Sequence, residues 1–172
     1  MEEIIIQNKI TQKDYIRFAF VNTYRKPSII VISALSTAMV ITSILYFLGI
    51  FKYFSEPPYF ELIFGLYFTL FFPIYLWIQS IRTFKTMGRL HESITYHFRE
   101  ENIQIVGESF NSQYSWDKIF KIKDLKNWVL IYQSKNTANI LLKKSFGVSF
   151  PDFRTMVQNH SEVKSKFRKD NK

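Results

Sequence analysis

The basic side chains are the residues whose type and spacing most directly predict an interaction. Residues 82–172 contain 17 Lys and Arg against 9 Asp and Glu. An ammonium group near an anionic membrane surface contributes about 1 kcal/mol to binding. Six lysines form two clusters: Lys118, Lys121, Lys123 and Lys126, and then Lys143 and Lys144. The pattern predicts contact with anionic lipid headgroups, and the alternative is that the charge only orients this part of the chain at a membrane.

Residues that could hold a metal or perform catalysis do not form a recognisable constellation. The chain has no cysteine, and no two of its three histidines have the spacing of metal ligands. Phosphate-cradling and nucleophile motifs are missing from the sequence, and its carboxylates are separated by predicted turns. We therefore expect no catalytic residue, no metal site and no cofactor. A membrane enzyme is the least favoured interpretation.

Two long apolar runs occupy residues 28–50 and 59–81. A helix of that length rises about 35 Å, slightly more than the roughly 30 Å hydrocarbon core of a bilayer. The first run contains no Asp, Glu, Lys, Arg or His, and the second contains only one such residue, Glu61, near its start. Two such helices in so short a chain would leave too little polar surface to cover them as a buried core. The sequence therefore predicts a transmembrane hairpin in a multi-pass protein, with the lipid bilayer as a partner.

The distribution of basic residues predicts the orientation of this hairpin. Residues 1–27 contain five Lys and Arg, whereas the connection 51–58 contains one, Lys52. Further bases follow the second run at Arg82, Lys85 and Arg89. Basic residues in short loops stay on the cytoplasmic side. We expect both termini to be cytoplasmic.

Small residues predict how the two membrane helices pack, because helices in lipid approach closely only where side chains are small. The stripe in the first helix is Ala34, Ala38 and Thr42, and the stripe in the second helix is Gly65, Thr69 and Pro73. We expect these two stripes to face each other. A kink is expected near Pro73, because proline removes a backbone donor.

The parts outside the hairpin predict an α+β protein with a small antiparallel β-sandwich or barrel. Residues 3–7 form a strand and residues 11–26 an interfacial helix, whereas period-two alternation begins after Gly88. The predicted later strands are 94–98, 103–106, 111–116, 119–123, 128–133 and 138–143. A C-terminal helix from Pro151, with an apolar stripe reaching Phe167, caps this sheet. The plan is pleckstrin-homology-like, and we expect the N-terminal strand to join the sheet.

These elements divide the chain into three segments: 1–27, the hairpin 28–87 and a cytoplasmic domain 88–172. The core of that domain is predicted to contain Trp116, Ile119, Leu130 and Phe153. For Trp116, packing in the core is favoured over stacking on a ligand. Residues 120 and 122 are expected to point inward, which places Lys121 and Lys123 on the outer face.

Several short motifs of the C-terminal part resemble the YcxB-like family. They are Tyr96-x-Phe98, Ile103, residues 115–119 (SWDKI), Lys121-Ile122 and residues 140–146 (ILLKKSF). Members of that family are bacterial proteins with a two-helix membrane hairpin and a C-terminal domain of this pattern. The resemblance implies the bacterial inner (plasma) membrane as the location, and it supplies no activity.

Three hypotheses for function follow from the sequence. The leading hypothesis is a non-catalytic, membrane-anchored interaction or regulatory module that binds a protein, a peptide or a second copy of the chain. The alternative is a lipid-contacting accessory or transport-related protein. The third is the membrane enzyme. Nucleic acid is not an expected partner, because the sequence contains no recognised nucleic-acid-binding module.

Overall fold

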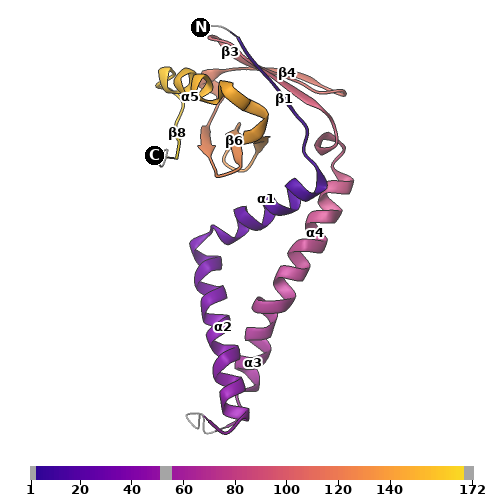
Figure 1. Cartoon of the computed structure of the whole chain (residues 1–172), viewed down its shortest axis with the longest axis vertical. Helices are drawn as coiled ribbons and strands as arrows, with labels where there is room; N and C mark the ends of the chain where they lie inside the picture. The colour runs from indigo at the N-terminus through magenta and orange to yellow at the C-terminus, as the bar shows by residue number, and fades with distance from the viewer. Residues whose placement is uncertain (1–2, 51–55, 169–172) are drawn as a thin grey trace. The chain divides into compact units, whose positions relative to one another are not determined.

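The computed structural model describes residues 3–50 and 56–168. The chain divides into two compact units (Figure 1). The helical unit is Gln12–Thr86, and the β-unit combines Met1–Thr11 with Met87–Lys172. The mixed α+β class expected from the sequence, with two apolar helices and antiparallel sheets, is confirmed. The N-terminal segment and the C-terminal half of the chain thus fold together into one unit.

The helical unit begins with α1 and continues into two long helices. Its elements are α1 (Gln12–Tyr24), α2 (Pro27–Phe47), α3 (Tyr59–Leu66), the π-helical segment η1 (Tyr67–Phe71) and α4 (Phe72–Thr86). Pro27 opens α2, where its missing N–H costs nothing. Gly49, with a φ of 74°, ends it. The first long helix therefore stops at Phe47 and not at the predicted residue 50.

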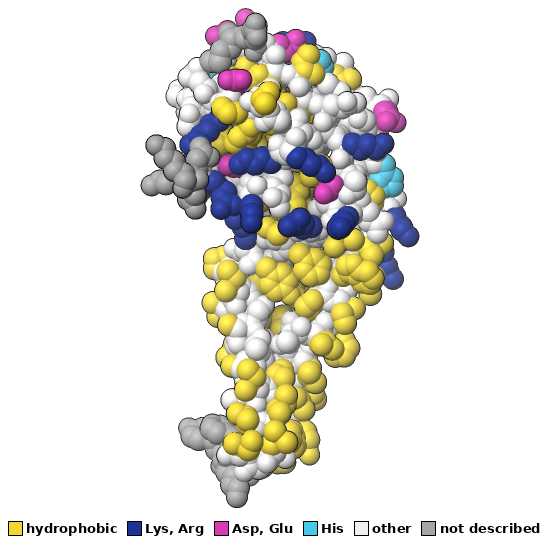
Figure 2. All heavy atoms as spheres, in the orientation of Figure 1, with side chains coloured by type: hydrophobic (Ala, Val, Ile, Leu, Met, Phe, Trp, Pro, Cys, Tyr) yellow, Lys and Arg dark blue, Asp and Glu magenta, His cyan; other side chains and the backbone are white. Residues whose placement is uncertain are grey.

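Two helices are long and apolar enough to cross a membrane. They are Pro27–Phe47, with 21 residues, and the continuous stretch Tyr59–Thr86, with 28 residues. Figure 2 shows hydrophobic side chains along the drawn face of these helices. The second stretch widens into a π-helical turn directly ahead of Pro73, where the N–H of Phe72 bonds to the carbonyl of Tyr67. Such turns and prolines are recognised causes of helix kinks, at the point where the sequence predicts one.

The β-unit contains two four-stranded sheets, with strand orders β1-β2-β3-β4 and β7-β6-β5-β8. The strands of the first sheet are β1 (Ile4–Asn8), β2 (Ile94–Phe98), β3 (Asn102–Val106) and β4 (Asn111–Ser115). Those of the second are β5 (Lys121–Asp124), β6 (Trp128–Tyr132), β7 (Ala138–Leu142) and β8 (Ser165–Lys166). The predicted addition of the N-terminal strand is confirmed, because β1 pairs with β2 in an antiparallel register.

Short helices and one longer helix complete the β-unit. They are the 3₁₀ segments η2 (Gly88–Leu90), η3 (Trp116–Lys118) and η4 (Lys143–Ser149), and α5 (Phe150–Asn159). Pro151 stands in the first turn of α5, where it needs no hydrogen bond. The N-terminal strand, the sheets and α5 all contribute to one hydrophobic core.

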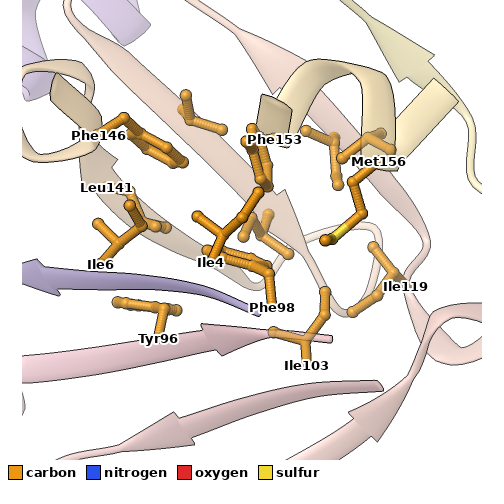
Figure 3. Packing of buried hydrophobic residues seen from close by; sticks show 14 of the residues in the cluster. Ile4, Ile6, Tyr96, Phe98, Ile103, Ile119, Leu141, Phe146, Phe153 and Met156 are labelled. Atoms are coloured by element: carbon orange, nitrogen blue, oxygen red, sulfur yellow. The ribbon is translucent and has the colours of Figure 1, made fainter. Parts of the chain in front are cut away.

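Aromatic rings form the centre of that core (Figure 3). The ring of Phe153, from α5, lies 4.8 Å from the rings of both Phe98 and Phe146. Trp116 is 2% exposed, and its indole N–H donates to the carbonyl of Arg99 at 3.0 Å. The prediction that Trp116 is a core residue is confirmed.

The prediction for Phe120 is wrong and that for Leu130 is confirmed only in its burial, and both differences concern which face of the second sheet a side chain occupies. Leu130 is buried but lies outside the core cluster, because alternation along β6 sends Val129 and Ile131 to the core face. Phe120 is 38% exposed, whereas Ile119 is buried in the core. The η3 turn precedes these two residues and β5 starts only at Lys121, so strict alternation does not extend back to position 120.

The C-terminal helix is shorter than predicted. It ends at Asn159, and the chain continues past it to β8, which lies beside β5 in a parallel register. Phe167 does pack against the core, but from this extended segment. Pairing with β5 explains why the helix ends early, because the backbone N–H of Ile122 donates a hydrogen bond to the carbonyl of Lys164 at 2.9 Å. A longer helix would leave that donor at the sheet edge without this partner.

Candidate anion-binding groove

The pairing of β5 with β8 brings together lysines that are distant in sequence. Ile122 lies opposite Ser165, and Lys123 lies opposite Lys166. A groove of about 290 Å³ follows this pair of strands. Its basic residues, which we call the lysine groove, are Lys121, Lys123, Lys164 and Lys166.

The core fixes the direction in which these lysines point. Ile122 is 1% exposed and belongs to the core, so period two sends Lys121 and Lys123 to the opposite face of the sheet. On the other strand, buried Val163 anchors the segment that leads into β8. The exposed Lys164 and Lys166 follow it. The hydrophobic core therefore positions a basic surface on its outer side.

The groove concentrates positive charge. Like charges directly opposite on paired strands are destabilising, and Lys123 faces Lys166 in this way. A cation–π interaction stabilises one of these charges, since the ammonium of Lys121 lies 4.4 Å from the ring centroid of Tyr132. A bound anion would interact favourably with the ammonium groups of the groove. Phosphate and carboxylate groups are the anions whose oxygens suit several ammonium donors at once.

The structure distributes the six predicted lysines among different environments. Lys121 and Lys123 line the groove, and Lys126 is exposed in the turn after β5. Lys118 is exposed in η3 and pairs with Asp117 at 3.3 Å. Hydrogen bonds from Ser115 and then Lys118 lower the pKa of Asp117. Lys144 is exposed at the start of η4.

Lys143 forms an ion pair within the β-unit. Its ammonium donates to both carboxylate oxygens of Asp124, at 2.9 and 3.0 Å, and it covers the ring of Phe150 at 4.1 Å. The Asp124 side chain is only 2% exposed and also accepts the backbone N–H of Arg168 at 3.2 Å. Lys143 therefore takes part in an internal ion pair, and its predicted lipid contact stays a prediction. Sequence reasoning missed Asp124, because no local pattern relates two residues 19 positions apart.

The helix contact of the hairpin uses only part of the predicted stripes. Gly65 is buried, and a Cβ there would lie 2.8 Å from the carbonyl oxygen of Ser36. The buried residues of α2 are Ser36 and Ser43. The exposed predicted residues are Ala34, Ala38 and Thr69, whereas Thr42 and Pro73 are half-buried.

A different face of α2 therefore meets the second helix. Ser36 and Ser43 are seven residues apart, which places them on one face after two helical turns. Serine is small enough for close approach and satisfies its own hydroxyl, because the Ser36 Oγ donates to the carbonyl of Ile32 at 2.6 Å. The predicted alanine stripe therefore does not form the contact, and Ser36 and Ser43 face Gly65 and its helix instead.

Comparison with known families concerns the C-terminal part of the chain. Residues 98–157 match the family model described as YcxB-like protein. The resemblance expected from the sequence is confirmed for this region, which runs from the end of β2 into α5. No curated protein and no solved structure matches the chain. Lys121 and Lys123 lie inside the matched region, whereas Lys164 and Lys166 follow it.

Proposed function

We propose that this chain is a non-catalytic integral membrane protein whose β-unit is a membrane-anchored interaction module for anionic lipid headgroups. The observation that carries the proposal is the lysine groove, in which two paired strands present four ammonium groups to one space. Each well-placed base contributes about 1 kcal/mol near an anionic leaflet. The groove thus offers more attraction than an isolated surface lysine.

In this proposal α2 and the helix 59–86 cross the bacterial inner membrane as a hairpin with both termini in the cytoplasm. Their length and composition support the crossing, and the basic residues on both sides of the hairpin support the orientation. The chain contains no cysteine, so single thiols can be introduced cleanly. We expect Glu56→Cys to react with an impermeant maleimide in intact cells and Asn159→Cys to react only after lysis. Labelling of residue 159 in intact cells would indicate the opposite orientation and contradict the proposal.

The attachment of the β-unit supports a role at the membrane surface. Three residues separate β1 from α1, and seven separate α4 from β2. At no more than about 3.6 Å per residue, these connectors reach about 11 and 25 Å. The potential of an anionic leaflet extends about one Debye length, roughly 8 Å at physiological salt. At full extension the two connectors span roughly one and three Debye lengths.

We further propose that the β-unit has a pleckstrin-homology-like plan. Two sheets packed around one core, followed by a C-terminal helix that adds Phe153 and Met156 to it, support this comparison. The helical unit is inserted between β1 and β2, and β8 follows the helix. These two features differ from a pleckstrin-homology plan. The face of β5 that carries Lys121 and Lys123 still points away from the core.

The test compares two charge-neutralised pairs in the full-length protein. A donor fluorophore at Asn159→Cys would report energy transfer to acceptor-labelled lipid headgroups in nanodiscs. We expect more transfer in discs containing phosphatidylglycerol than in phosphatidylcholine discs, and less at high salt. Lys123→Gln with Lys166→Gln should weaken docking roughly 30-fold, from about 1 kcal/mol per base. The matched control is Lys135→Gln with Lys144→Gln, and equal effects of the two pairs would exclude the groove.

A protein partner is the second candidate. A groove of about 430 Å³ lies between β1 and α5, with Ile5 and Met156 in its lining and the carboxylate of Asp152 beside them. Glu3 also lines this groove, but its carboxylate pairs with Arg99 at 2.8 Å. Ile5 is 57% exposed. This combination fits an extended segment that carries a basic residue next to an apolar one. A photoreactive residue at position 5 should cross-link such a peptide, and one at the control position Lys135 should not; no adduct at position 5 would remove this candidate.

A further inference from the structure

A third groove lies within the helical unit, between α1 and α4. The two helices are joined at both ends by aromatic contacts, with Tyr15 and Phe84 at 6.0 Å and Tyr24 and Phe72 at 6.4 Å between ring centroids. α1 therefore runs opposite to α4, and Trp77 falls between the two contacts. The space left between the helices has a volume of about 760 Å³. Its lining residues are Gln12, Lys13, Ile16, Arg17, Phe20 and Trp77.

Charge and apolar surface are arranged side by side in this groove. Lys13 and Arg17 are four residues apart, so they project from one face of α1, and both are exposed. Ile16 and Phe20 are also four residues apart and supply a neighbouring apolar face. Trp77 contributes a ring that is half exposed. One ligand that satisfies the whole groove must be both anionic and strongly apolar.

We propose that the α1–α4 groove is a binding site for one anionic phospholipid. The headgroup phosphate is bound by Lys13 and Arg17, since the guanidinium can donate two parallel hydrogen bonds and the ammonium supplies a point charge. An acyl chain lies on Ile16, Phe20 and Trp77. The volume is within the range of 300 to 1,000 Å³ that is usual for ligand sites.

This inference rests on the membrane placement proposed above, but it does not depend on the lysine groove. A free phosphate would use only the basic side of the groove, and a neutral lipid or detergent only the apolar side. An acidic peptide would leave the exposed ring of Trp77 without the apolar partner that a membrane-facing tryptophan favours. The phospholipid combines both requirements in one molecule.

The first arm of the test measures lipid retention by native mass spectrometry of the full-length protein in a neutral detergent. We expect one molecule of phosphatidylglycerol to be retained in preference to phosphatidylcholine. Lys13→Gln with Arg17→Gln should reduce retention roughly 30-fold, from about 1 kcal/mol per base. Arg25→Gln with Lys26→Gln removes the same charge at the far end of α1 and should have little effect. Equal retention by both double variants would overturn the proposal.

The second arm detects the acyl chain. Phosphatidylglycerol brominated on its acyl chains should quench part of the tryptophan fluorescence of the wild-type protein, and that part should disappear in Trp77→Phe. Quenching of the same size in both proteins would place the chain elsewhere and overturn the site. Inorganic phosphate should not displace the bound lipid, and displacement would instead indicate a phosphate site. Substitutions in the lysine groove should leave retention unchanged, so the failure of one proposal can be distinguished from failure of the other.

Discussion

The substitution Asn8→Ala tests how the two sheets of the β-unit are held together. Asn8 ends β1 and is 1% exposed. Its Nδ2 donates to the carbonyl of Ile140 at 3.0 Å, and its Oδ1 accepts the N–H of Leu142 at 2.9 Å. The side-chain amide thereby pairs with the edge of β7 as a neighbouring strand would. It links β1 of one sheet to β7 of the other.

The expected loss of stability follows from those two hydrogen bonds. Alanine would leave the buried backbone N–H of Leu142 and the partly buried carbonyl of Ile140 without this partner. Leaving one buried polar group unsatisfied costs about 1–3 kcal/mol. With partial relaxation we expect about 2–4 kcal/mol for the pair, or roughly a 30- to 700-fold change in the unfolding equilibrium. Asn8→Asp should cost at least as much, because a carboxylate keeps the acceptor but loses the donor.

Urea unfolding of the full-length protein in detergent micelles, followed by tryptophan fluorescence, measures this effect. Trp116 and Trp128 are buried in the β-unit and report on its unfolding. Gln7→Ala is the matched control, since Gln7 is exposed on the same strand and makes one side-chain hydrogen bond, to Ser93 at 3.2 Å. We expect the control to cost less than about 0.5 kcal/mol. If Asn8→Ala unfolds at the same urea concentration as Gln7→Ala, the link between the sheets does not contribute as argued.

Three further predictions concern packing, a buried charge and pH. Gly65→Ala should destabilise the hairpin by about 1–3 kcal/mol in thermal unfolding, because its Cβ would meet backbone at 2.8 Å, whereas exposed Ala38→Leu should not. Asp124→Ala should lower the stability to urea by about 3–5 kcal/mol, since it leaves a partly buried ammonium unpaired; a loss below 1 kcal/mol would contradict this. Hydrogen bonds from Ser109 lower the pKa of Glu92, so their stabilisation is present above the ordinary glutamate pKa and is lost as the pH falls through the lowered value. Ser109→Ala should flatten that part of the stability profile.

Local pattern was sufficient for most elements of this protein, with β8 and the end of α5 as exceptions. The two apolar runs predicted the long helices, because an uninterrupted apolar run of this length matches a helix that spans the hydrocarbon core of a bilayer. Alternation of apolar residues predicted strands close to β2 and β3, since every second side chain is buried there. The N-terminal strand was also predicted to join the sheet, because residues 90–172 alone provide too small a core.

The candidate sites depended on contacts that no local pattern encodes. Lys164 and Lys166 were read as the end of a helix, and only the pairing of β8 with β5 places them beside Lys121 and Lys123. The serine face of α2 was selected by the shape of the other helix at Gly65. In each case several arrangements satisfy the same local periodicity. The choice among them is made by partners distant in sequence, through backbone hydrogen bonds at a sheet edge or close packing between helices.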